Sequence, residues 1–421
     1  MKAGTGVNRA EAVLDELEDS ILLRLGTRLR EEDWAMKARL ESFRSLRKTS
    51  FPSFRYASGI LVKPNFSLID FSQLSRFVPE TESAKIGFIG PEEISVIKGT
   101  RLSQIDEKTI SLFRGLSYSE QSCAGQPSWF SLFNDAFANS FLLLRIPAGL
   151  KLDRPAVVEI DADHLPQITN IFIITGTGSK AKVFIKKRSR KDAEGGNWYF
   201  GLNVRVFAGE ESELRIMSTQ QLGLGVAFFE DRKAHVSKAA DVEWFDLSFG
   251  AGYANSAVLS NLAGMNARTG IRCLFAATNN QKIDLFTSAI HAAPRTRSDI
   301  LTRGVVNEEA RALSRGLIVM QEGSGGSEGY EKQDTLLLCD RSEANAIPEL
   351  EIRNHDVKCS HGSTVGQIES DKLFYLLSRG IMLEDAKKLI IKGYFDFLLS
   401  ELSADERSQA TVVLEEALVE V

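Results

Sequence analysis

The sequence contains few cysteines, and their arrangement excludes two kinds of cross-linked fold. The 421 residues include only 4 cysteines, and none of them forms a CxxC pair. This density is too low for a disulfide scaffold, and the spacing does not match a zinc ribbon. A chain of this length can bury a large core without such cross-links. We therefore expect a protein of a reducing compartment.

The sequence also lacks an excess of basic charge and a long apolar segment. Lys plus Arg total 51 and Asp plus Glu total 56, which gives a formal net charge of −5. A nucleic-acid-binding domain is usually strongly basic. No run approaches the roughly 18 apolar residues of a membrane span, and the N-terminus shows no secretory signal. We expect no nucleic-acid or membrane partner, and a cytoplasmic location (or the plastid stroma, if a transit peptide was removed).

A phosphate-binding loop is absent as well. Residues 176–180, GTGSK, lack the Walker spacing, and a predicted strand rather than a helix follows them. Because no helix N-terminus is available to hold a phosphate, we expect a turn there and no bound nucleotide. The basic run at 186–191 has no interleaved aromatic residues, which favours an exposed loop. The glycine-rich segment 323–329 is predicted to be a surface loop.

Helical patterns occur near both ends of the chain. Apolar residues recur at three- and four-residue steps at Leu14, Leu17, Ile21, Leu22 and Leu25, which indicates a helix. We expect that helix to end at Gly26, a second helix at about 31–46, and a connector with one or two short strands at about 49–79. From Ser370 we predict three helices, the first ending before Gly380, then 383–392 ending at Gly393, and 394–402. The pattern Ser403-x-x-Glu406 predicts a capping box that opens a last helix.

The long middle part of the chain has a sequence pattern typical of β-strands. Short β-branched and aromatic runs separated by turn residues predict strands at 170–175, 181–186, 202–206, 213–218, 242–248, 271–276, 282–290 and 316–320. Only residues 128–141 look helical. Stacked sandwiches, a propeller and a β-solenoid are the candidate architectures. No 40-residue repeat supports a propeller, whereas a solenoid tolerates unequal coils, so we favour a solenoid. The predicted domains are 1–80, 81–368 and 369–421.

The densest group of reactive side chains lies at residues 354–362. Cys359 and His361 are two residues apart, so on a strand they share one face. A thiolate and an imidazole can ligate a soft or borderline metal, including iron in a cluster. Two ligands are too few, so a partner or a transient ligand must complete such a site. The alternative is that Cys359 is a small core residue and His361 is hydrogen-bonded. His291 at a predicted strand end is expected to be structural.

Residues 348–352 and 356–366, PELEI and DVKCSHGSTVG, resemble the most recognisable stretch of the SufB/SufD family of iron–sulfur cluster assembly proteins. The helical segment 373–381 follows at the family's spacing. Residues 287–291 with Ser298, Gly304, Val305 and Gly316, and residues 134–139, also follow the family pattern. The similarity is strong from about 280 to 400 and loose over the first 120 residues.

The resemblance implies a mainly β fold, a right-handed parallel β-helix core with N- and C-terminal helical domains. It implies a non-enzymatic role in building or delivering iron–sulfur clusters. Family members pair through their β-helix cores, here with a SufB-like paralogue or an identical subunit. They bind a SufC-type ABC ATPase through C-terminal helices, for which the candidate residues are Leu373, Phe374, Leu377, Leu389, Ile390, Phe397 and Leu398.

Within the family, the chain resembles SufD more than SufB. Gln333 stands where SufB-like chains carry a cysteine, and Ser363 where they carry a glutamate. The resemblance therefore favours His361 over Cys359 as the functional residue, at an interface that holds a transient cluster or iron. Two alternatives remain, a carbohydrate-active β-helix enzyme and a purely structural interaction protein. The first needs clustered acidic residues, which the sequence does not show.

Overall fold

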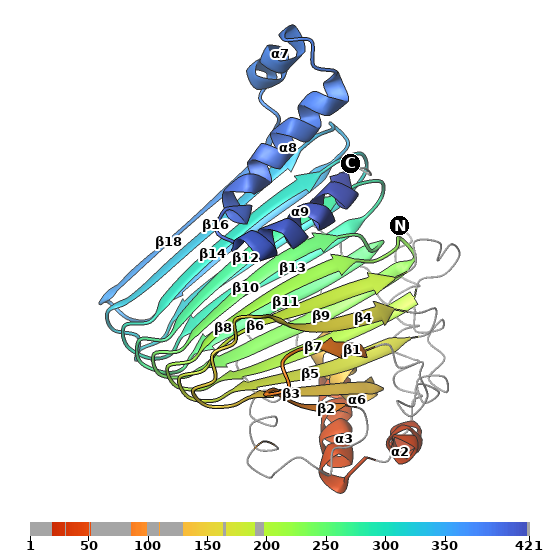
Figure 1. The fold of residues 1–421 in the computed structure, drawn as a ribbon, viewed down its shortest axis with the longest axis vertical. Coiled ribbons are helices and arrows are strands. Elements are labelled where there is room, and N and C mark those ends of the chain that lie inside the picture. Colours follow the sequence, from red (N-terminus) through yellow and green to blue (C-terminus); the bar gives the residue numbers. More distant parts are fainter. Residues whose placement is uncertain are drawn as a thin grey trace.

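The strands of the chain form a β-solenoid with helices at both ends (Figure 1). The computed structural model describes residues 19–29, 31–49, 51, 86–98, 109, 129–162, 166–189 and 198–418. Within these residues the strands make two nine-stranded sheets, and each coil contributes one strand to each sheet. The predicted mainly β class, with a solenoid core and terminal helices, is confirmed. No helix in the described part of the chain is both long and apolar enough to cross a bilayer.

The two sheets follow the order of the coils. Sheet A consists of β1 (Ile86–Ile89), β4 (Ala156–Ala162), β6 (Lys180–Ser189), β8 (Glu213–Gln221), β10 (Asp241–Phe249), β12 (Arg268–Ala277), β14 (Arg297–Val306), β16 (Ser327–Leu337) and β18 (Val357–Gln367). Sheet B consists of β2 (Ser95–Lys98), β3 (Ser140–Ile146), β5 (Gln167–Thr175), β7 (Trp198–Ala208), β9 (Val226–Val236), β11 (Tyr253–Leu262), β13 (Lys282–His291), β15 (Arg311–Met320) and β17 (Glu343–Ile352).

Pairing between coils is parallel throughout the body of the solenoid. The exceptions among the described strands are β1 on β4 and β2 on β3, which pair antiparallel at the first coil. This pattern rules out stacked sandwiches built from hairpins. All eight predicted runs fall inside strands, but each strand extends beyond its predicted run. The reason is that in-register pairing with both neighbouring coils keeps the flanking polar residues extended as well.

The corners of the solenoid are built on residues in the left-handed conformation. They stack from coil to coil at Gly149, Gly178, Glu211, Ala239, Asn266, Arg295 and Gly326. The N–H of Gly178 donates to Glu210 O, and the N–H of Glu211 donates to Lys238 O. The donor–acceptor distance is 2.9 Å in each case. Residues 176–180 are therefore a turn between β5 and β6, as predicted. The predicted surface loop at 323–329 is shorter than expected, because β16 begins at Ser327 and the side chain of Ser324 is buried.

The main core fills the space between the two sheets. Alternate residues of each strand face inward, as in the pattern of β4, and they stack in columns with the residues of the neighbouring coils. Trp244, on β10, is fully buried, and its indole N–H donates to Ser260 Oγ over 3.1 Å. Burial of one residue in two from every coil gives the solenoid a continuous apolar core.

The inner face also carries charge, which corrects the expectation of an exposed loop at 186–191. Residues 186–189 belong to β6, and the Lys187 side chain is buried. Its Nζ lies 2.7 Å from Glu230 Oε1, and Arg232 pairs with Asp246 beside it. Strand alternation turns Lys187 inward, where these carboxylates compensate its charge. The remainder of the predicted loop, 190–191, lies outside the described residues.

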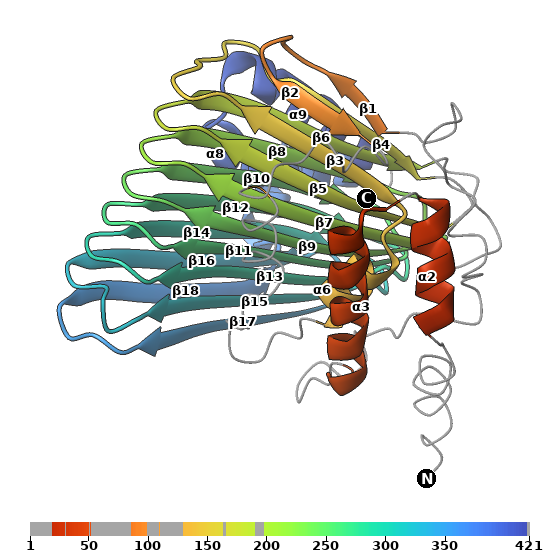
Figure 2. The same cartoon turned by 90° about the horizontal axis from the view of Figure 1, so that it is seen from below.

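The N-terminal helices pack on the outer face of sheet B (Figure 2). They are α2 (Asp19–Arg28), α3 (Asp33–Lys48) and α6 (Trp129–Phe137). Gly26 does not end α2, because it is buried and Met36 fills the space that a side chain there would need. The second predicted helix corresponds to α3, and the ambiguous segment 128–141 contains α6. Leu14, Leu17 and most of the connector at 49–79 lie outside the described residues.

Segment 134–139 joins α6 to the solenoid. Asn134 donates to Phe229 O over 3.1 Å and accepts a hydrogen bond from Tyr199 Oη over 2.8 Å. Asn139 Oδ1 accepts the N–H of Ile168 over 2.9 Å. The family-like motif thus satisfies backbone groups at the end of a helix and the edge of a coil, which is a structural role.

Three helices follow the last coil, α7 (Ser370–Ser378), α8 (Leu383–Leu399) and α9 (Ala404–Leu418). Gly380 lies just past the end of α7 with a φ of 83°, as predicted. The predicted break at Gly393 is wrong, because α8 continues to Leu399. Burial of Phe395, Leu398 and Leu399 against sheet A outweighs the roughly 1 kcal/mol that a helical glycine costs.

Gly304 offers a test of close packing inside the solenoid. The ring of the buried residue Phe275 lies where a side chain on Gly304 would stand. We therefore expect Gly304→Ala to lower the free energy of unfolding by about 1–3 kcal/mol. Gly270→Ala on the neighbouring strand, whose nearest contact would be 3.7 Å away, should change it by less than about 1 kcal/mol. Urea unfolding of both variants measures this, and equal effects would contradict the packing argument.

Candidate functional site

The last coil leaves one edge of each sheet without a neighbour among the described residues. β18 is the terminal strand of sheet A and β17 that of sheet B, and they lie together at one end of the stack (Figure 2). Each presents a row of backbone donors and acceptors on its outer edge. Pro348 within β17 agrees with an edge position, since proline cannot pair on both sides. This open edge carries the predicted site.

Cys359 and His361 both lie on β18, on the face that continues the inner columns of the solenoid. Cys359 pairs in register with Gly329 and His361 with Glu331. Cys359 is half-buried against the main core, whereas His361 is exposed. Burial, and next the nearby Glu331 carboxyl, raise the pKa of the Cys359 thiol to about 11. The thiol is therefore protonated at neutral pH and has to lose its proton to bind a metal.

Two polar residues lie beneath this pair on the inner face of β16. Glu331 and Gln333 are both fully buried, and Gln333 Nε2 donates to Glu331 Oε1 over 2.6 Å. The Glu331 carboxyl occupies the space left by the missing side chain of Gly316 on the opposite sheet. Burial raises the pKa of Glu331 to about 7. The sequence analysis did not identify Glu331 as part of the site.

The side chains at this edge do not form a closed metal site as they stand. Among the described residues, no three His, Cys, Asp or Glu side chains lie close enough together to hold a metal ion. His361 is exposed, so its ring is free to turn. The structure therefore shows a potential ligand pair and a buried acid, and completion of the site by something outside Cys359 and His361 stays a prediction.

His291 and Cys273 are buried elsewhere in the solenoid. The two ring nitrogens of His291 lie 2.7 Å from Thr296 Oγ1 and 2.8 Å from Ser298 Oγ. Burial lowers the pKa of His291 to about 4, so the ring is neutral. This supports the expected structural role. Cys273 lies 3.6 Å from Asp246 Oδ2, and burial raises the pKa of its thiol well above the usual value.

The candidate docking residues on the C-terminal helices divide into exposed and buried sets. Phe374 is 72% exposed, Phe397 56% and Leu389 50%, and Leu377 is also exposed. Leu373 and Ile390 are half-buried. Leu398 is fully buried against sheet A, so it packs the helix onto the solenoid and is not available to a partner. Exposed Tyr375, Met382 and Leu383, which the sequence analysis omitted, extend the apolar surface along α7 and the start of α8.

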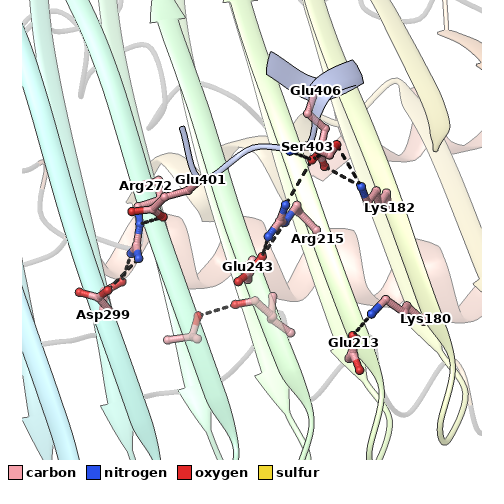
Figure 3. Close-up of polar contacts among 12 residues, drawn as sticks. Lys180, Lys182, Glu213, Arg215, Glu243, Arg272, Asp299, Glu401, Ser403 and Glu406 are labelled. Atoms are coloured by element: carbon pink, nitrogen blue, oxygen red, sulfur yellow. Dashed lines mark hydrogen bonds and ion pairs between the residues drawn. The ribbon is translucent and has the colours of Figure 1, made fainter. Parts of the chain in front are cut away.

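Charged side chains of the α8–α9 turn hold these helices on sheet A (Figure 3). Glu406 accepts from Arg215 over 3.2 Å and lies 3.4 Å from Lys182 Nζ. Arg272 donates to Glu401 over 2.7 Å. Figure 1 shows the outcome, with α8 and α9 lying over sheet A and α7 projecting away from the solenoid.

The predicted capping box at Ser403 is part of the same contact. Glu406 Oε2 accepts the backbone N–H of Ser403 over 2.9 Å and also its hydroxyl. Burial by itself raises the pKa of Glu406, but the Ser403 hydrogen bonds and the charges of Arg215 and Lys182 outweigh it, and the pKa is lowered. One buried carboxylate therefore both caps α9 and attaches it to two strands.

Glu406→Gln tests this contact through its pH dependence. Because the folded-state pKa lies below the ordinary 4.5, the carboxylate stabilises the fold above that pH and loses this effect as pH falls through the folded-state pKa. We expect the variant to lose about 1–3 kcal/mol of unfolding free energy near pH 7, and progressively less on acidification. Urea unfolding across pH measures it. The exposed Glu415→Gln is the control, and a deficit that grows at low pH would contradict the argument.

Comparison with known proteins identifies the family of the chain. The family profile described as SUF system FeS cluster assembly, SufBD core domain, matches residues 158–394. An iron–sulfur cluster assembly SufBD family protein of Mycobacterium leprae is 26% identical over 266 residues, which cover 63% of this chain and 30% of that protein. A SufBD family protein of Staphylococcus aureus strain USA300 is 22% identical over 423 residues, which cover 92% of this chain and 90% of the relative. The chain therefore belongs to the SufBD family and is a component of the SUF system of iron–sulfur cluster assembly.

Proposed function

We propose that the chain is the SufD-like subunit of a SUF assembly complex. In this role it pairs through its last coil with a SufB-like subunit or with a second copy of itself. The observation that carries the proposal is the open edge of β17 and β18, which bears Cys359 and His361. The first coil has antiparallel β1 and β2 on its edges, whereas the last coil has no such cover among the described residues. An exposed strand edge pairs readily with another chain.

The residues of the inner columns support the SufD-like assignment. Gln333 is buried beneath the edge, and Ser363 pairs with it in register. These are the positions at which SufB-like chains carry a cysteine and a glutamate. The inner face of the last two coils therefore offers one thiol and one imidazole, too few to hold a cluster alone. A partner that brings further ligands to the edge completes the site, with iron or a transient cluster as cargo.

We propose that the exposed apolar residues of α7 and α8 bind a SufC-type ABC ATPase. Large apolar side chains such as Phe374 and Phe397 are typical anchors of an interface. Residues 176–180 form a corner of the solenoid, so a separate chain supplies the nucleotide site. The chain itself acts as a non-catalytic scaffold in the cytoplasm, or in the plastid stroma if it is imported. Membership of the SufBD family removes the basis for the carbohydrate-active alternative.

Point variants test the docking of the ATPase better than deletion of residues 370–421. Deletion would expose the apolar face of sheet A that α8 and α9 cover, so loss of binding could reflect misfolding. We expect Phe374→Ala and Leu389→Ala each to weaken binding of the ATPase by about 1–2 kcal/mol, or roughly 5- to 30-fold. Calorimetric titration measures this. Val412→Ala, an exposed apolar residue of α9, is the control, and docking on α7–α8 is wrong if all three variants bind equally.

His361→Ala tests the role of the edge. The side chain is exposed, so we expect normal expression and normal pairing of subunits. Iron and acid-labile sulfide per reconstituted complex should fall strongly, because a ligand is removed. Cys359→Ser should have a smaller effect if Cys359 mainly packs against the core. Unchanged cluster content in His361→Ala would favour a purely structural protein, and failure to pair would make His361 an interface residue only.

A further inference from the structure

The inner face of β16 carries two buried oxygen atoms for which the described residues supply no donor. Glu331 Oε2 and Gln333 Oε1 have no hydrogen-bond partner. The two side chains bond to each other through their other polar atoms, Gln333 Nε2 and Glu331 Oε1. Both residues are 0% exposed. Buried acceptors in proteins are nearly always satisfied, so this pair of oxygens points to a bound group that donates hydrogen bonds or carries positive charge.

Glu331 differs in this respect from the other buried carboxylates of the described residues. Those carboxylates belong to Glu230, Asp231, Asp246, Asp284 and Glu406, and each forms an ion pair with a lysine or arginine. Glu331 forms none with any described residue, and another acid, Glu349, lies near enough to act on it. A buried charge without a counterion is costly. Burial therefore favours the protonated carboxyl, and a cation that takes the place of this proton has to come from outside this column of the core.

The position of the pair identifies the direction from which a cation enters. β16 is the last strand of sheet A that has neighbours on both sides, and only β18 lies beyond it. His361 lies directly opposite Glu331 in the register, and Ser363 opposite Gln333. The exposed ring of His361 and the half-buried thiol of Cys359 thus stand between solvent and the two oxygens. A cation that enters at the open end of the solenoid passes these side chains first.

We propose that Glu331 and Gln333 supply two oxygen ligands of an iron(II) site that His361 closes with its imidazole. Carboxylate oxygen, amide oxygen and imidazole nitrogen form a mixed set suited to divalent iron. The inference rests on the proposed function, since it takes iron as the cargo of the edge. It adds Glu331 and Gln333 to the two residues that the sequence suggested. The His361 ring turns inward on binding, which accounts for the absence of a closed three-ligand group in the described residues.

The test uses the full-length chain under anaerobic conditions. Cobalt(II), whose visible spectrum reports coordination, and iron(II) are titrated separately into the purified protein. We expect Glu331→Gln to weaken binding of both ions by 10- to 100-fold. Glu328→Gln is the matched control, because Glu328 lies on the same strand but faces outward toward Arg297. Unchanged affinity in Glu331→Gln, or no binding by the native chain, would overturn the proposal and leave a buried water as the donor.

A second pair of variants separates this inference from the proposed function. If His361→Ala weakens binding and Glu331→Gln does not, the oxygen ligands are wrong while the role of His361 stands. If only Glu331→Gln weakens binding, the oxygen site stands and the role of His361 in it fails. If neither does, the chain alone binds no iron at this edge and the inference is overturned, whereas the proposed function is decided by the cluster content of the reconstituted complex. Should Glu331→Gln fold poorly by circular dichroism, Gln333→Met is expected to weaken binding in the same direction, and native affinity there also overturns the proposal.

Discussion

The structure depends on in-register hydrogen bonding between successive coils. A single coil of the SufBD solenoid has two apolar faces to bury and cannot do so alone, so its stability comes from the coils on either side. Register fixes which side chains stack, and strand alternation fixes which of them face inward. This is why Lys187 can lie in the core. Its side chain reaches across the core to Glu230 on β9 of the opposite sheet, and the two charges compensate each other.

A ladder of this kind has to end, and its two ends differ. At the first coil, the short strands β1 and β2 pair antiparallel with the outer edges. Short edge strands of this kind prevent pairing with a further strand. At the last coil, β17 and β18 keep free backbone groups among the described residues. Gly362 and Gly366 on β18 also have open space beside them, which leaves room for the close approach of another backbone. Cys359 and His361, the two potential metal ligands, lie at this end of the solenoid and not at the other.

The sequence predicted the parts of the structure that local patterns determine. Alternation identified the strands, and the two-residue step placed Cys359 and His361 on one face. Glu331 was missed because its relation to His361 is set by register across coils, 30 residues away. The coils have no constant length, since successive members of the column Asp241, Arg268, Arg297 and Glu328 are 27, 29 and 31 residues apart. A usable signal was the step from Glu331 to Gln333, two polar residues at inward positions of a strand.

Tertiary packing also overrode local signals in the helices. Glycine at 26 and 393 suggested helix ends, but both helices continue because their apolar faces are buried. In the sequence, Leu398 belongs to the same helical pattern of apolar residues as Leu389 and Phe397. The pattern alone therefore could not show that Leu398 faces the solenoid while the other two are exposed. Only the position of sheet A decides between packing and docking for such residues.

The C-terminal helices meet the solenoid close to the candidate site. Arg303 on β14 contacts the carbonyl of Tyr394 on α8, and its guanidinium lies 4.6 Å from the centre of the Phe397 ring. In the register, Arg303 is followed by Asp334 on β16, the neighbour of Gln333. Sheet and helices are joined here by a buried apolar layer and by ion pairs, and close-packed contacts of this kind have low compressibility. Helix α8 is therefore fastened to β14, two strands from the edge that carries His361.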